Sequence, residues 1–121
     1  MNWIRILALA ITLGWDVQEG FGPRYGPGVM ERVSRNRDMP LVGCMISSPT
    51  LPLGSWAYVY GVRSKVLRYC RITDVSQDVD RARHIRTKRI AELSFEVAKS
   101  ICGHTTEPSI DCPIIVISEG E

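Results

Sequence analysis

The chain has 121 residues, 45% of them hydrophobic and 23% charged, and these proportions exclude an intrinsically disordered protein. Its length supports one domain with a single core. The formal net charge of +2 is too small to indicate nucleic-acid binding by itself. We therefore expect one globular domain with no nucleic-acid partner and no cofactor.

The N-terminal segment has the pattern of a secretory signal. A short positive start, MNWIR, precedes an apolar run from Ile6 to Leu13. This run has the length of a signal h-region and is shorter than the roughly 20 residues that a membrane span requires. We expect residues 1–19 to be a signal peptide or an N-terminal extension, and residues 20–121 to form the domain. The alternative is that the run forms the first strand or helix of the fold.

The segments after residue 20 are short and mostly of strand composition. Residues 20–28, GFGPRYGPG, predict a loop with a very short strand around Tyr25. Residues 29–37 predict a weak helical turn, which Pro40 closes. Strands are expected at residues 41–46, 55–62, 66–72 and 113–118.

One strong helix is predicted near the C-terminus. Apolar residues recur at helical spacing between Ile90 and Ile101, Ser94 is a good N-cap, and Gly103 ends the helix. The helix is therefore expected at about 94–102. Short, evenly spaced strands with one helix predict a small closed β-barrel with a flanking helix, and a β-sandwich is the alternative.

Residues 75–89 are predicted to be a polar, basic loop. The run DRARHIRTKR from Asp80 to Arg89 could grip an anionic polymer. Asp78 and Asp80 partly offset the charge, and no aromatic residues are interleaved for base stacking. We interpret the run as a solvated loop, with His84 at the surface and Arg89 as a candidate substrate contact.

Trp56, Tyr58 and Tyr60 alternate on one face of the predicted strand 55–62. Exposed, this stripe would stack on sugar rings, whereas buried it would be core packing. We favour core packing for the stripe and retain Trp56 as a candidate sugar contact.

The four cysteines suit two disulfides in an exported protein, and three pairings are possible. The simplest joins Cys102 to Cys112, tying the end of the helix to the last strand, and leaves Cys44 to pair with Cys70 across strands. A zinc site at Cys102, His104 and Cys112 lacks a fourth ligand and matches no common spacing. We therefore expect no metal.

The order of several short motifs along the chain is also informative. TLPLG at 50–54 is followed by a hairpin, by RITD at 71–74 and by RIAELSFEVAKSICG at 89–103, and RYGPG precedes them all. Together they resemble the double-psi β-barrel of rare lipoprotein A and the expansins over roughly residues 25–118. The resemblance implies a six-stranded double-psi β-barrel with one flanking helix.

The resemblance also assigns roles to individual residues. Asp74 matches the aspartate at a strand end, Glu92 matches the acid of a "D-L-S" segment that is the general acid/base of lytic members, and Thr50 matches a threonine of the glycan groove. Ser48 stands where the lytic members have histidine, and Glu92 stands where they have aspartate. The longer glutamate displaces its carboxylate by about one C–C bond, a misplacement that can cost about 10²-fold in rate.

The resemblance implies a protein that is secreted, periplasmic or associated with the cell wall, and whose partner is a wall glycan. Because both departures fall on positions that the chemistry needs, we favour a non-hydrolytic protein that binds or loosens wall polysaccharide. The alternative is a lytic-transglycosylase-like enzyme that uses Asp74 and Glu92, one with a raised pKa and the other ionised. A secreted defence or virulence protein similar to barwin is a further alternative.

Overall fold

A computed structural model describes residues 3–103 and 111–119. The elements follow in the order α1 (Trp3–Thr12), β1 (Asp16–Gly22), α2 (Val29–Asn36), β2 (Met45–Ser48), β3 (Trp56–Gly61), β4 (Leu67–Val75), α3 (Asp78–Arg86), β5 (Glu92–Leu93), α4 (Phe95–Cys102) and β6 (Cys112–Ser118). The fold is mainly β, as predicted. The prediction of a single helix is wrong, since the described residues contain four.

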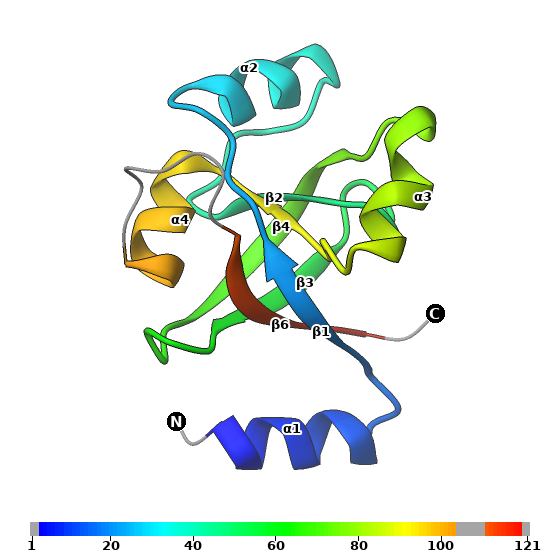
Figure 1. Ribbon diagram of the computed structural model, residues 1–121, viewed down its shortest axis with the longest axis vertical. Coiled ribbons are helices and arrows are strands. Elements are labelled where there is room, and N and C mark those ends of the chain that lie inside the picture. The colour runs from blue at the N-terminus through cyan, green and yellow to red at the C-terminus, as the bar shows by residue number, and fades with distance from the viewer. Residues whose placement is uncertain (1–2, 104–110, 120–121) are drawn as a thin grey trace.

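The six strands form one mixed sheet in the order β1-β6-β3-β4-β2-β5, which curls into a half-barrel (Figure 1). Neighbouring strands are antiparallel except β2 and β4, which are parallel. Helices α1 and α2 lie at opposite ends of the long axis of the molecule, and α3 and α4 flank the sheet on either side.

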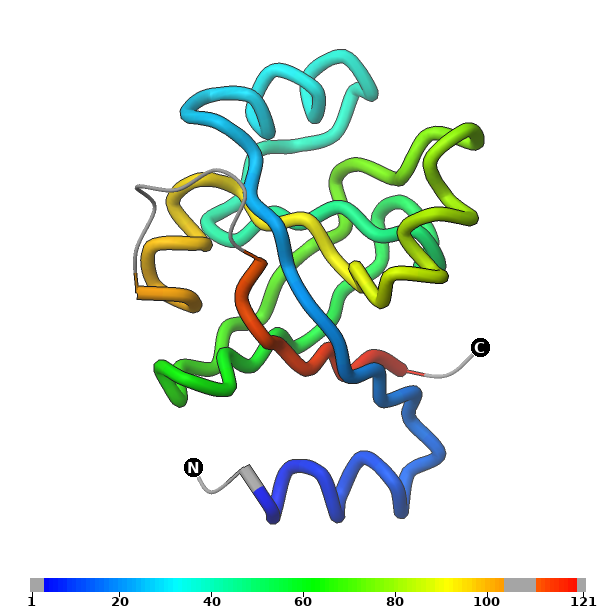
Figure 2. Tube along the Cα trace, viewed as in Figure 1, coloured from blue at the N-terminus to red at the C-terminus, as the bar shows by residue number. Residues whose placement is uncertain are grey.

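The two outer strands of the sheet approach each other where the chain leaves β1 (Figure 2). The Phe21 amide donates to the Lys88 carbonyl at 2.8 Å, and the Tyr25 amide donates to the Leu93 carbonyl at 2.8 Å. A Cβ at Gly20 would lie within 3.0 Å of the Lys88 carbonyl oxygen, so only glycine permits this approach. The glycine-rich stretch predicted as a loop is therefore strand in its first part.

The apolar N-terminal run forms helix α1, and β1 begins at Asp16. The expected boundary at residue 19 falls inside β1, whose seven residues pair with β6 from Asp16–Ser118 to Gly22–Cys112. Ala10 of α1 is buried with Ile117 of β6 in a small second cluster. Within the described residues, no helix is long and apolar enough to cross a membrane.

The alternation along β3 separates two environments, as predicted. Ala57 and Val59 face the main core inside the half-barrel, where they are 1% and 0% exposed. Tyr58 and Tyr60 pack on the other face in the small cluster beneath α1, which confirms core packing for these two. Trp56 is 39% exposed, and its ring stacks on that of Tyr69 with the ring centroids 5.0 Å apart. The prediction of core packing is therefore wrong for Trp56.

Helix α4 confirms the sequence prediction closely. The Ser94 hydroxyl accepts a hydrogen bond from the Val97 amide at 3.3 Å, and Gly103 ends the helix with a left-handed conformation at φ 82°. The basic stretch 75–89, in contrast, is not a loop, because it contains helix α3. Acidic residues in the first turn of α3 and basic residues in its last turn complement the helix dipole.

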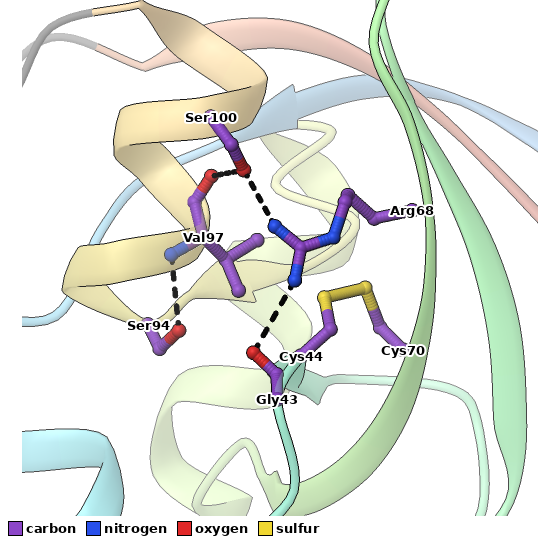
Figure 3. Close-up of a disulfide and its surroundings, with 7 residues drawn as sticks. All are labelled: Gly43, Cys44, Arg68, Cys70, Ser94, Val97 and Ser100. Atoms are coloured by element: carbon purple, nitrogen blue, oxygen red, sulfur yellow. Dashed lines mark hydrogen bonds between the residues drawn. A yellow bond between two sulfur atoms is a disulfide. The ribbon is translucent and has the colours of Figure 1, made fainter.

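The structure confirms both disulfides, Cys44–Cys70 and Cys102–Cys112. Figure 3 shows the first of them under the side chain of Arg68, which donates to the Ser100 hydroxyl at 2.9 Å. The guanidinium of Arg68 thereby links β4 to α4 over the disulfide.

Removing the Cys102–Cys112 bond should destabilise the protein measurably. The bond closes a loop with a sequence separation of 10, and the chain-entropy model values such a closure at about 2–3 kcal/mol. The variant Cys102→Ala/Cys112→Ala should therefore lose about that much unfolding free energy in urea. An unchanged urea midpoint would contradict this account of the bond.

Candidate functional site

The polar end of the half-barrel contains a cavity of about 560 Å³ between α2 and α3. Its lining residues are Tyr25, Val29, Val33, Asn36, Arg37, Asp74, Val75, Ser76, Gln77, Asp80, His84 and Glu92. We call it the Asp74–Glu92 cavity. Its volume falls within the range of about 300–1,000 Å³ that is common for small-molecule sites.

Strand register explains why the two predicted acids share one cavity. Ser47 of β2 is paired with Asp74 of β4 on one side and with Glu92 of β5 on the other. The three residues thus form a row across the sheet, and a strand spacing of about 4.8 Å separates the two acids by about 10 Å of backbone. A register shift in β2 between Ile46 and Ser47 sets this row.

Asp74 lies near the end of β4, inside the strand rather than beyond it. It is 7% exposed, and both of its carboxylate oxygens have partners. The Tyr25 hydroxyl donates to Oδ2 at 2.7 Å, and Nε of Arg37 donates to Oδ1. Burial is the main cause that raises the pKa of the Tyr25 phenol, which therefore stays a hydrogen-bond donor. Asp74 is held as an oriented, ion-paired anion.

Glu92 occupies a different environment, although it lies in the same row. Its side chain is 23% exposed. Burial raises the pKa of its carboxyl group, and the negative charge of Asp74 raises it further, while Arg89 acts in the opposite direction. The cavity therefore combines the ion-paired carboxylate of Asp74 with the Glu92 carboxyl group, whose pKa is raised above its ordinary value.

His84 is buried, at 7% exposure, so the prediction of a surface position is wrong. Its Nδ1 lies 2.7 Å from the Ser76 hydroxyl oxygen, and its Nε2 lies 3.5 Å from Oε1 of Glu92. The helix α3, absent from the sequence prediction, turns this side chain inward over the end of β4.

The other predicted site residues lie apart from the Asp74–Glu92 cavity. Thr50 and Arg89 line a separate cavity of about 280 Å³, and Arg89 pairs with Asp111 at 2.9 Å. Ser48 is 1% exposed, and its hydroxyl accepts hydrogen bonds from the amides of Thr50 and Leu51, so it shapes the turn. Trp56 lies on the outer face of the sheet, with the Arg71 guanidinium 5.7 Å from its ring centroid.

A metal site is also absent from the part of the chain that the structure describes, where no group of three His, Cys, Asp or Glu side chains is arranged to hold one. Cys102 and Cys112 are joined to each other. His104, the remaining residue of the rejected zinc hypothesis, lies outside the described residues.

Of the residues that line the cavity, the sequence predicted only Asp74 and Glu92 as site residues. Among the others, Tyr25 and Arg37 bond to Asp74, His84 contacts Glu92, and Ser76 contacts His84. Tyr25 and Arg37 reach Asp74 from 49 and 37 residues away, and no local pattern encodes such contacts. Asp80 and His84 are four residues apart, a spacing that places both side chains on one face of a helix. This spacing is the signal from which their shared position in the cavity could be predicted.

Comparisons with known proteins assign no family to the chain. No protein-family profile matches the chain. No curated protein matches it either.

Proposed function

We propose that the protein is an exported protein that binds a cell-wall polysaccharide in the Asp74–Glu92 cavity and is non-hydrolytic toward the glycan strand. The observation that carries the proposal is the single cavity shared by the two acids that the motif resemblance selects. Asn36, Gln77 and the carboxyl groups offer hydrogen-bond donors and acceptors of the kind that sugar hydroxyls need. Tyr25 adds an aromatic ring beside them.

The fold proposed with this function is the double-psi β-barrel. The half-barrel supports it through its six strands and through the backbone hydrogen bonds between residues 21–25 and 88–93, at the edge where a barrel would close. Export is supported by the two disulfides, which persist in oxidising compartments.

Wall binding tests the proposal directly. Replacing Asp74 by asparagine removes a charged acceptor and should weaken binding to purified peptidoglycan about tenfold or more, because a hydrogen bond to a charged group contributes about 1.5–3 kcal/mol. The bound fraction is measured by pull-down on insoluble wall, after thermal melting shows that the variant is folded.

Asp78→Asn is the matched control, since the Asp78 side chain is 94% exposed and lies outside the cavity lining. It should bind like the parent. Failure of the parent to bind, or equal weakening in both variants, would contradict the proposal.

A second candidate function is cleavage of the glycan strand, in the manner of a lytic transglycosylase. The raised pKa of Glu92 beside the ion-paired Asp74 favours it, because a general acid must retain a proton at working pH. In this mechanism Glu92 gives its proton to the leaving glycosidic oxygen, and a hydroxyl of the same sugar attacks the anomeric carbon in place of water. The proton of that hydroxyl returns to Glu92, and Asp74 remains an oriented anion.

A further inference from the structure

Ser76, His84 and Glu92 form a chain of contacts inside the Asp74–Glu92 cavity that glycan binding does not require. The Ser76 hydroxyl oxygen lies 2.7 Å from Nδ1 of His84, and Nε2 of the same ring lies 3.5 Å from Oε1 of Glu92. All three residues line the cavity. A hydroxyl beside a base that a third group orients is the arrangement of an activated nucleophile.

The state of His84 suits a general base. Burial lowers the pKa of its imidazole, and the nearby Arg83 and Arg89 lower it further, while Asp80 acts in the opposite direction. The ring is therefore neutral at neutral pH. With the Glu92 carboxylate facing Nε2, the proton is favoured on Nε2, which leaves Nδ1 free to accept the proton of Ser76.

The position of Ser76 at the start of a helix favours the reaction. Ser76 stands between β4, which ends at Val75, and the nine-residue helix α3, which begins at Asp78. The N-cap residue Gln77 makes no side-chain capping bond, and its carbonyl accepts the amides of Asp80 and Arg81 at 2.9 Å. The positive end of the helix dipole at this N-terminus favours the negative charge that develops on an oxyanion beside Ser76.

We propose that Ser76 is the nucleophile of an ester-cleaving site, with His84 as its general base and Glu92 as the residue that positions His84. Ser76 Oγ attacks the ester carbonyl carbon, and its proton passes to His84 Nδ1. The bond to the alkoxy oxygen then breaks, and the imidazolium returns the proton to the departing alcohol. Water attacks the acyl-Ser76 ester in the same way, which releases the carboxylic acid and restores the serine.

The cavity indicates the class of ester. The carboxyl groups of Asp74, Asp80 and Glu92 disfavour an anionic acyl group, and the volume of about 560 Å³ is that of a small-molecule site. The substrate is therefore an uncharged ester of a hydroxyl-rich alcohol, such as an O-acylated sugar. The sugar part of this assignment rests on the proposed function, whereas the serine chemistry does not.

The test uses a fluorophosphonate probe and p-nitrophenyl acetate. Labelling of the full-length parent protein, followed by peptide mass spectrometry, should place the probe on Ser76. Ser76→Ala should lower p-nitrophenyl acetate hydrolysis about 10³-fold, and His84→Gln about 10²-fold. Ser100→Ala, on the outer helix α4, is the matched control and should react like the parent.

Glu92→Gln gives a readout that a purely structural role would not move. Loss of the carboxylate beside Nε2 should shift the rising limb of the pH–rate profile to lower pH, since the imidazolium loses its stabilising charge. No probe on Ser76 in the parent protein, or a probe only on another residue, overturns the proposal. Wall binding without labelling of Ser76 would contradict the ester proposal alone. Labelling of Ser76 without wall binding would contradict the glycan proposal alone.

Discussion

Gly61→Ala should destabilise the protein by about 3 kcal/mol, the upper end of the cost of forcing extra atoms into a packed interior. Gly61 is the last residue of β3 and is paired with Ile114 of β6. A Cβ at this position would lie within 3.0 Å of the Ile101 carbonyl oxygen and of the Ser64 hydroxyl. The Ser64 hydroxyl donates to that same carbonyl at 2.6 Å, so the hairpin and the end of α4 are already in contact there.

The atoms around the added Cβ cannot move aside at low energetic cost, because one of them is the backbone carbonyl oxygen of Ile101, next to the Cys102–Cys112 disulfide. Urea unfolding measures the effect, and Gly43→Ala is the matched control. A Cβ at Gly43 would meet no atom within 4 Å, so this variant should change stability little or raise it by about 0.4–1 kcal/mol. Equal stability of the two variants would mean that α4 does not pack against the β3–β4 hairpin as described.

The contrast between α4 and α3 shows which parts of the fold the sequence could predict. Helix α4 has an apolar stripe, a serine cap and a terminal glycine, and each of these signals is local. Helix α3 lacks a continuous apolar face, and only its charge order marks it as a helix. His84 lies in α3, so its buried position could not be predicted without that helix. Its contacts with Ser76 and Glu92 arise from tertiary packing, which the local sequence does not encode.

The candidate site divides in the same way. Motif order predicts Asp74 and Glu92 as site residues, and strand pairing through Ser47 brings them into one row. Arg37 reaches that row from the end of α2 through packing that no spacing rule encodes. Thr50 is predicted by the same motifs, yet it lines a different cavity, and α3 contributes lining residues to both cavities.

Glu92→Gln should lower any release of soluble muropeptides from purified wall by about 10²–10⁴-fold, the contribution of general acid–base catalysis. Glutamine keeps the shape of the side chain but carries no proton to give. Release is measured by chromatography of the soluble fraction, with wall binding recorded in parallel. Glu92→Asp should keep or raise the activity, whereas absence of release by the parent would eliminate the enzyme alternative.

The same substitution should raise stability at neutral pH. Burial and Asp74 raise the pKa of Glu92 in the folded state above its unfolded value, so the folded protein binds this proton more tightly. The stability that this proton contributes is fully present below the unfolded pKa of about 4.3 and is lost as pH rises through the folded pKa. The ionised, half-buried carboxylate therefore costs free energy at pH 7, and the neutral glutamine does not.

Urea unfolding at two pH values separates this effect from a general change in packing. Glu92→Gln should be more stable than the parent at pH 7, and the difference should shrink at about pH 3.5, where the parent's Glu92 is protonated in both states. Glu96→Gln is the matched control, because the Glu96 side chain is 72% exposed in the first turn of α4. Loss of the Glu96 charge should not stabilise the protein at pH 7, since the helix dipole favours a negative charge at this position. A Glu92→Gln variant that is less stable at pH 7 would mean that the ionised carboxylate is stabilised in the fold, and Glu92 would then be a poor general acid.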